Sequence, residues 1–309
     1  MKLIAPAYYK KFHCIAEKCR HNCCLGWEID IDADTLDKYS QLGGEIGKEI
    51  RESISYEPQP HFELCEIERC PHLDKRGLCR IIAELGEGML CDICREHPRF
   101  YNDCGDHSEV GLGLACEEAC RIILMSDEYN LFEQIGEIAG EDGERFASID
   151  FRCQVYSILK GLSDTYEKKL KAIYEKFKIS PAVLDAEQWE KLIKRLEYMD
   201  RSHRDMFLNF SVDIKTPKRI EKTAERALAY FVYRHCSSAY SYDEYRASLG
   251  FCLFLERLFV SISVFCGFQN TDEIARTISE EIEYSEENTE TIKNEIFEAL
   301  ELFDQEKKC

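Results

Sequence analysis

The sequence predicts a mainly α-helical protein in which a metal-organised region of short helices and loops precedes an α-helical bundle or array. Twelve of the 17 cysteines lie within the first 120 residues, together with five of the seven prolines. From about Ser126 onward, apolar residues recur three or four positions apart, and the alternation typical of strands is almost absent. We therefore predict a cysteine-rich domain over residues 1–125 and an α-helical domain over residues 126–309.

Helical periodicity marks five stretches of the second domain. Each carries an apolar stripe that we expect to form core. Ser180 and Pro181 combine an N-cap residue with a proline at the first helical position, so they predict the start of a further element. The five stretches are 151–177, 186–199, 220–236, 242–266 and 289–303.

Composition indicates a globular protein, and its net charge disfavours some classes of binding partner. Hydrophobic residues make up 45% of the 309 residues, and 40 basic against 59 acidic side chains give a net charge of −19. Such a field repels nucleic acids and anionic membrane surfaces and attracts a basic, lysine-bearing partner. The most apolar window, residues 253–268, is short and interrupted by Glu256 and Arg257, which argues against a membrane span. The N-terminus lacks the apolar stretch of a signal peptide, so we expect a cytoplasmic protein.

In a reducing cytoplasm, clustered cysteines indicate metal or redox chemistry and not a disulfide framework. The odd total also argues against complete pairing. Thiolates suit zinc or iron–sulfur clusters, which take about four ligands each. Adjacent cysteines point in different directions, which favours a multi-iron cluster over a single zinc ion, although zinc stays an alternative. The short-range sets are Cys14-x4-Cys19-x3-Cys23-Cys24, Cys70-x8-Cys79, Cys91-x2-Cys94 and Cys116-x3-Cys120.

Three front-region cysteines have a weaker claim to bind metal. Cys65 and Cys104 have no close cysteine partner in the sequence, and Cys120 fits equally well on the buried face of a helix that starts near Cys116.

Four segments, in order, resemble the flagellin lysine-N-methylase family: FHCIAEKCRHNCCLGWEIDID, CPHLDKRGLCRI, LCDICREHPRFY and GLACEEACRIIL. They are also similar to the wider group of zinc- or iron-chelating proteins marked by CxxxCxxCC. The resemblance covers residues 8–125. It implies methyl transfer from S-adenosylmethionine to lysine ε-amines of flagellin, with an iron–sulfur cluster, most often [4Fe–4S], taking part. The thiols it implies as ligands are Cys14, Cys19, Cys23, Cys24, Cys70, Cys79, Cys91, Cys94 and Cys116.

Familiar methyl-donor motifs are missing. The segment GLGLA at residues 111–115 lacks the flanking strand and helix pattern of a nucleotide-binding loop. The radical S-adenosylmethionine spacing CxxxCxxC is also absent, because Cys24 follows Cys23 directly. The sequence therefore assigns no catalytic residue and predicts an unusual donor site.

Residues just after the cysteine pair are candidates for supporting roles. Trp27 is expected to shield a metal centre from water. Glu28, Asp30 and Asp32 are candidate proton acceptors, because a lysine with a pKa of about 10.4 must lose a proton before it attacks. They are weak candidates, because alternating acids beside Ile29 and Ile31 more often form a solvated edge.

Two other functions fit the same residues. One is a non-catalytic zinc- or iron-chelating protein with a structural or redox-sensing role. The other is an adaptor whose acidic helical half binds a basic partner while metal only folds the front half. Iron content distinguishes the cluster enzyme from the zinc protein, and a methylation assay distinguishes an enzyme from an adaptor.

Overall fold

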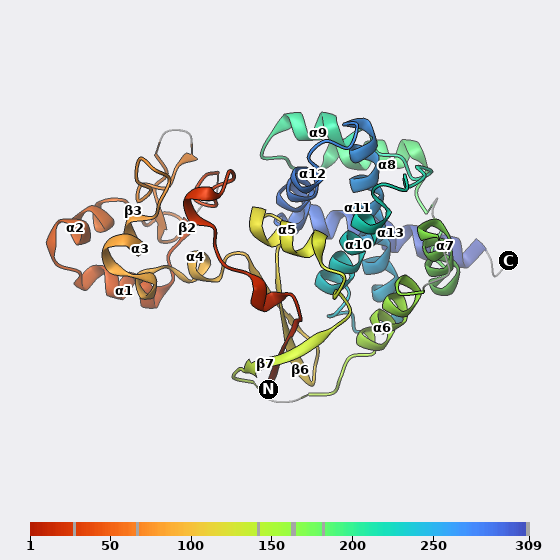
Figure 1. Cartoon of the computed structure of the whole chain (residues 1–309), viewed down its shortest axis with the longest axis horizontal. Coiled ribbons are helices and arrows are strands. Elements are labelled where there is room, and N and C mark those ends of the chain that lie inside the picture. The colour runs from red at the N-terminus through yellow and green to blue at the C-terminus, as the bar shows by residue number, and fades with distance from the viewer. Residues whose placement is uncertain (27–28, 66–67, 141–142, 162–164, 181–182, 307–309) are drawn as a thin grey trace. The chain divides into compact units, whose positions relative to one another are not determined.

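Figure 1 shows the computed structural model of the chain, which describes residues 1–26, 29–65, 68–140, 143–161, 165–180 and 183–306. The chain forms two compact units. A cysteine unit comprises His13–Arg99, and a helical unit comprises Met1–Phe12 and Phe100–Cys309. Most regular structure is α-helical, as predicted.

The units divide the chain elsewhere than at the predicted boundary, residue 125. Cys104, Cys116 and Cys120 belong to the helical unit. The reason is that the segment after Arg99 pairs with the N-terminal strand and then packs helix α5 (Glu117–Met125) on α10 and α12.

The cysteine unit consists of short elements joined by loops. Its helices pack around a small core with Tyr39, Ile50 and Phe62 at the centre, each at most 2% exposed. A three-stranded antiparallel sheet has the order β2-β4-β3. The elements are η2 (Ala16–Lys18), β2 (Ile29–Asp30), α1 (Ala33–Gln41), α2 (Gly44–Glu52), β3 (Ile54–Ser55), β4 (His61–Phe62), α3 (Arg80–Leu85), η4 (Glu87–Met89) and α4 (Asp92–Glu96).

The helical unit combines a small sheet with a helical array (Figure 1). Its first elements are β1 (Lys2–Pro6), η1 (Tyr9–Lys11), β5 (Arg99–Asp103), β6 (His107–Leu112), α5 and β7 (Phe132–Glu137). The remaining elements are α6 (Ser148–Leu159), α7 (Tyr166–Phe177), α8 (Ala186–Arg195), α9 (Arg201–Phe207), α10 (Glu221–His235), α11 (Tyr242–Phe265), α12 (Thr271–Ile278), the π-helical η5 (Ser279–Glu283) and α13 (Glu286–Glu306).

The four-stranded sheet of this unit was not predicted. Its order is β5-β6-β1-β7, with β1 parallel to β6 and antiparallel to β7. The register pairs Lys2 with His107 and with Glu137. The sheet therefore joins the N-terminus to segments more than 100 residues away.

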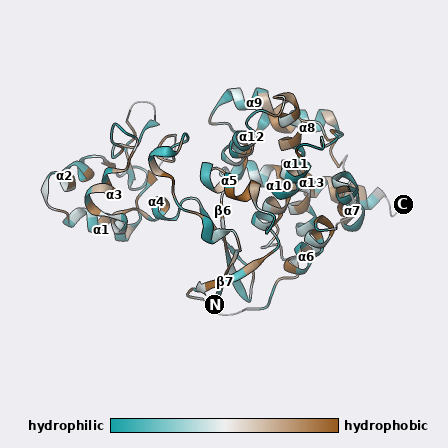
Figure 2. Cartoon of the chain, in the orientation of Figure 1, coloured by the Kyte–Doolittle hydropathy of each residue, from teal (hydrophilic) through white to brown (hydrophobic). Residues whose placement is uncertain are grey.

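Helix α11 is the centre of the helical unit, with α10, α12 and α13 packed around it. It is rich in hydrophobic residues, which Figure 2 colours brown, and the ring of Phe254 stacks on Trp189 of α8 at 4.6 Å. This 24-residue helix is long and apolar enough to cross a membrane, so the predicted length of the apolar stretch was too short. However, 89% of its apolar window is buried inside the protein, which is typical of a core helix.

The structure matches most predicted helices but divides one of them. The predicted helix over residues 151–177 is two helices, α6 and α7, because α6 ends at Leu159 just before Gly161. Pro181 lies outside the described residues, and α8 begins later, where Asp185 and Gln188 form a capping box.

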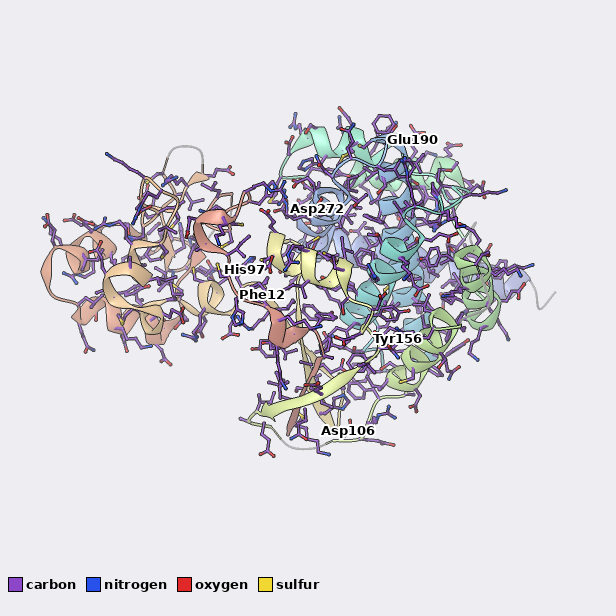
Figure 3. All side chains as sticks on the ribbon, viewed as in Figure 1. Phe12, His97, Asp106, Tyr156, Glu190 and Asp272 are labelled. Carbon is purple, nitrogen blue, oxygen red and sulfur yellow. The ribbon has the colours of Figure 1, made fainter. Side chains whose placement is uncertain are left out.

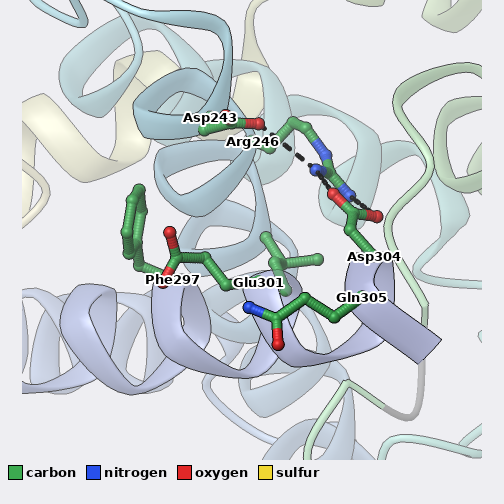
Figure 4. A pocket seen from close by; sticks show the side chains of 7 residues that line it. Asp243, Arg246, Phe297, Glu301, Asp304 and Gln305 are labelled. Atoms are coloured by element: carbon green, nitrogen blue, oxygen red, sulfur yellow. Dashed lines mark hydrogen bonds and ion pairs between the residues drawn. The ribbon is translucent and has the colours of Figure 1, made fainter. Parts of the chain in front are cut away.

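A small surface pocket lies between α11 and the end of α13 (Figure 4). The guanidinium of Arg246 donates to Asp243 at 3.4 Å and to Asp304 at 2.5 Å. It also donates to the carbonyl oxygens of Phe177 and Lys178. These contacts hold Arg246 in a structural role, because it fastens α11 to α13 and to the end of α7.

Candidate metal centre

Backbone hydrogen bonds bring the two cysteine sets around Cys24 and Cys70 together. The amide of Cys70 donates to the carbonyl oxygen of Cys24 at 2.9 Å. The side chain of Asn22 accepts from the Cys24 amide at 3.0 Å and donates to the Gly77 carbonyl at 2.9 Å. The loop after η2 is therefore fixed beside the segment that leads to Cys79.

The other cysteines of this unit stand at the starts of short helices. Cys79 precedes α3, and its backbone pairs with Leu73. Cys91 precedes α4, and Cys94 lies on that helix. A CxxC spacing that straddles a helix start places both thiols on one side of the first turn.

Six of the nine predicted thiols interact with one another in the described structure. The thiols of Cys23 and Cys24 share a hydrogen bond, and so do those of Cys91 and Cys94. Cys24 interacts electrostatically with Cys70 and Cys94. Cys70 interacts in the same way with Cys79 and Cys91. We call this set the six-thiol group: Cys23, Cys24, Cys70, Cys79, Cys91 and Cys94.

Thiol–thiol hydrogen bonds separate the pKa values within each pair. The bond from Cys24 lowers the pKa of Cys23 to about 7, and the same bond raises the pKa of Cys24. The bond with Cys94 likewise lowers the pKa of Cys91 and raises that of Cys94. In each pair, the thiol with the lowered pKa is the one that loses its proton more readily. Thiolates bind soft metals, so Cys23 and Cys91 are the more ready donors of the two pairs.

The inner side of the six-thiol group is dry. Cys91 is fully buried and Cys70 is 6% exposed, and both belong to the core of the cysteine unit. Burial raises the pKa of Cys70 to about 11, although the backbone N–H of His72 donates to its sulfur. The Tyr39 hydroxyl donates to the Met89 carbonyl at 2.7 Å and lies 3.6 Å from the Cys91 sulfur. Hydrogen bonds to cysteine sulfur are a typical feature of protein metal centres.

Three of the nine predicted ligands lie outside this group as the structure describes it. Cys14 is exposed, and Cys19 is half-buried with its thiol 2.9 Å from the His21 carbonyl oxygen. Cys116 is in the helical unit, where it precedes α5. Their role as ligands stays a prediction.

The structure describes two of the four residues that were predicted to support the centre. Trp27 and Glu28 lie outside the described residues. Asp32 has a structural role, because it accepts hydrogen bonds from the amides of Thr35 at 2.9 Å and Asp92 at 2.8 Å. It thereby caps α1 and ties that helix to the start of α4, which positions Cys91 and Cys94. Asp30 lies in β2, and its Oδ1 is buried without a hydrogen-bond partner among the described residues.

Two residues near the group had no clear signal in the sequence. Cys65, which lies five residues before Cys70 in the chain, adds to the electrostatic rise in the pKa of Cys70. Its amide donates to the Arg69 carbonyl at 2.7 Å, which places the Cys65 backbone beside the residue that precedes Cys70. His72 is 2% exposed, and burial lowers its pKa to about 4. Its Nε2 contacts Ser53 Oγ at 2.9 Å.

Comparison with known proteins assigns the family. Over 126 aligned positions, the chain is 30% identical to the flagellar biosynthetic protein FliU of Salmonella muenchen, covering 38% of this chain and 75% of that protein. It is 31% identical, over the same length, to the lysine-N-methylases of Salmonella typhimurium and Salmonella choleraesuis. The chain belongs to the flagellin lysine-N-methylase family. The resemblance found from the cysteine motifs is therefore confirmed.

The similarity is confined to part of each protein. The match covers 31% of either lysine-N-methylase, so the chain spans about a third of the length of these relatives. No family model matches the chain. No solved structure matches it either.

Proposed function

We propose that this protein transfers methyl groups from S-adenosylmethionine to lysine ε-amines of flagellin, and that the six-thiol group binds an iron–sulfur cluster of the [4Fe–4S] type. The observation that carries the proposal is the interaction of six cysteines from three separate parts of the chain, in a member of the lysine-N-methylase family.

The donors of the six-thiol group fit such a cluster. A [4Fe–4S] centre takes about four thiolates, and this group holds six thiols with pKa values already separated within two pairs. The group as defined consists of thiols alone, without the carboxylate or imidazole ligands that many zinc sites include. When bound, the cluster would supply redox-active or Lewis-acidic iron.

The chain's own residues would hold this centre and keep water from its inner side. Cys70 and Cys91, which pack in the core with Tyr39, Phe62 and Ile81, would anchor it there. The His72 amide donates to the sulfur of Cys70 and would compensate part of its negative charge. The Tyr39 hydroxyl, whose hydrogen goes to the Met89 carbonyl, lies 3.6 Å from the sulfur of Cys91 and helps to fill the space beside it.

Methyl transfer itself requires a neutral amine. The nitrogen lone pair of lysine forms a bond to the methyl carbon, the sulfur–methyl bond breaks, and S-adenosylhomocysteine leaves. The amine then releases its extra proton to a base or to water. Because free lysine has a pKa of about 10.4, the protein must lower that value by burying the amine or must accept its proton.

A flagellar substrate agrees with the charge of the chain and with the names of its relatives. A net charge of −19 favours approach of a lysine-bearing surface. One relative is named as a flagellar biosynthetic protein. The proposal places the reaction in the cytoplasm, where thiols remain reduced and available to metal.

Two measurements test the proposal. The protein is purified without air, and its iron, acid-labile sulfide and zinc are quantified together with its visible spectrum. It is then incubated with S-adenosylmethionine and flagellin, and methylated lysines are identified by mass spectrometry. About four irons and four sulfides per chain, with methylation that needs both protein and donor, support the proposal.

The other outcomes identify the alternatives. Stoichiometric zinc in a colourless protein would make the chain a zinc-chelating structural protein. An iron–sulfur protein that binds flagellin without methylating it would be an adaptor or a redox sensor.

A further inference from the structure

Three metal-ligating side chains meet in the helical unit, at the turn between β5 and β6. Cys104, His107 and Glu109 each offer one ligand atom, and these atoms lie within 4.8 Å of one another. Their exposed fractions are 0%, 7% and 1%. None belongs to the six-thiol group, and the cysteine motifs gave Cys104 only a weak claim.

The backbone brings these residues together. Gly105, with φ +85°, and Asp106 form the turn, and the Cys104 amide donates to the His107 carbonyl at 3.0 Å. His107 and Glu109 are two residues apart on β6, so both side chains lie on one face of the sheet. Figure 3 shows Asp106 at this end of the sheet, away from the helices.

The imidazole of His107 is oriented as a metal-binding histidine is. Its Nδ1 lies 2.5 Å from the carboxylate of Asp106, and its Nε2 lies 3.4 Å from Oε1 of Glu109. When Nδ1 donates its hydrogen to Asp106, the Nε2 lone pair faces a carboxylate oxygen. Two acceptors that face each other require a cation between them, either a second proton or a metal ion.

The distance between His107 and Glu109 suits zinc. Two ligands bound tetrahedrally to Zn²⁺ at about 2.0–2.1 Å are about 3.3–3.4 Å apart, and Nε2 and Oε1 are separated by 3.4 Å. Histidines that bind zinc commonly donate their other ring N–H to a carboxylate, which is the contact that Asp106 makes here.

The surrounding charges balance a divalent ion. Arg152 of α6 donates to both oxygens of Glu109, at 2.6 and 2.5 Å, and Ser237 donates to Oε2 at 3.1 Å. One Zn²⁺, the thiolate of Cys104, the carboxylates of Glu109 and Asp106, and the guanidinium of Arg152 sum to zero. On binding, the ion displaces the Cys104 proton, and any proton held between His107 and Glu109, into solvent.

We propose that Cys104, His107 and Glu109 bind one Zn²⁺ ion, with Asp106 as a positioning residue and water as the fourth ligand. The ion fastens the β5–β6 turn and, through the Glu109–Arg152 pair, links the sheet to α6. This site is separate from the six-thiol group and independent of the proposed methyl transfer.

Zinc content of matched full-length variants tests the site. Parent, Cys104→Ser and His107→Gln proteins are stripped with a chelator under reducing conditions, loaded with excess Zn²⁺, desalted and analysed by mass spectrometry of the metal. Thiols of the cysteine unit bind zinc equally in all three, so each variant is expected to hold about one zinc ion fewer than the parent. The control is Cys153→Ser, which alters an exposed thiol of the helical unit. It is expected to hold as much zinc as the parent.

A second variant covers the case in which those substitutions prevent folding. Asp106 is partly exposed, so Asp106→Asn retains the fold while it loosens His107. We expect this variant to lose about 10–100-fold in affinity for one zinc equivalent, measured by competition with a coloured zinc chelator. Unchanged zinc content in folded Cys104→Ser and His107→Gln proteins overturns the site. So does an unchanged competition curve for Asp106→Asn.

Discussion

The guanidinium of Arg152 and the carboxylate of Glu109 form a bidentate ion pair. The Arg152 side chain is 3% exposed and the Glu109 side chain is 1% exposed. The rings of Phe132 and Tyr233 each lie 5.2 Å from the guanidinium carbon, so water has little access. Arg152→Ala would leave a buried carboxylate without its cation. We expect it to lower the free energy of unfolding by about 3–5 kcal/mol, measured by urea denaturation followed by circular dichroism.

Arg145 provides the matched control. It pairs with Asp150 at 2.7 Å, but these side chains are 41% and 64% exposed. Water screens such a pair, so Arg145→Ala is expected to cost at most about 1 kcal/mol. Equal losses in the two variants would show that burial of the Glu109–Arg152 pair does not determine its importance.

Two histidines that contact carboxylates of the π-helical segment η5 have pKa values shifted in opposite directions. His203 Nδ1 lies 2.6 Å from Glu281, and His235 Nε2 lies 2.6 Å from Glu283. The hydrogen bond to Glu281 raises the pKa of His203, which is partly exposed. Burial lowers the pKa of His235 to about 4, despite the hydrogen bond to Glu283. Two-dimensional NMR of the imidazole rings should show these two separate transitions.

The two shifts make opposite contributions to stability. Because His203 has a raised pKa in the folded state, its contribution is complete below about pH 6.5 and is lost as the pH rises through its folded pKa. Because His235 has a lowered pKa, its contribution is present above about pH 6.5 and is lost as the pH falls toward 4. His203→Gln should remove only the upper NMR transition. A single shared transition near pH 6.5 would contradict the assignment.

Helices of the second half could be predicted because their apolar stripes face one common core. Residues 220–236 and 242–266 were predicted as helices, and the structure has α10 and α11 within one residue of those bounds. The break between α6 and α7 was missed, because the apolar spacing continues across Gly161 and past the N-cap residue Thr165.

The sheet of the helical unit was missed for a different reason. Strand β6 is buried at every position, so it lacks the alternation by which a half-buried strand is recognised. Its partner β1 is about 100 residues away, and such long-range pairing leaves no local pattern.

Cysteine spacing accounts for part of the grouping of thiols in the structure, while the assignment of the nine thiols as ligands stays a prediction. Six of the nine predicted thiols interact in the described structure, because short spacings such as Cys91-x2-Cys94 constrain the backbone directly. The Cys104–His107–Glu109 site mixes three residue types across a turn. Only the β5–β6 pairing brings them together, so a count of cysteines could not reveal it.

Gly105 is expected to be essential for the turn that carries Cys104 and His107. Its φ of +85° is disfavoured for residues with a side chain, and a Cβ there would lie 1.9 Å from the Glu144 carbonyl oxygen. Gly105→Ala must therefore displace backbone. We expect a loss of at least about 2 kcal/mol in the free energy of unfolding, measured by thermal and urea denaturation.

Gly136→Ala is the control for this substitution. Gly136 lies in β7 of the same sheet, and no atom lies within 4 Å of the position of its added Cβ. Its effect is expected to stay within about 0.5–1 kcal/mol. A Gly105→Ala protein as stable as the Gly136→Ala protein would mean that the turn adapts without strain.

Single substitutions within the six-thiol group should separate metal ligands from other cysteines. Cys23→Ala and Cys94→Ala each remove one member of a hydrogen-bonded thiol pair, so we expect loss of visible absorption, of most bound iron and of flagellin methylation. Cys153→Ala, which removes an exposed thiol of the helical unit, should retain all three. Iron is measured in protein kept from air, and circular dichroism confirms folding. If a folded Cys94→Ala protein kept its full iron content and spectrum, Cys94 would not be a ligand. The centre would then be formed by the other five thiols of the group.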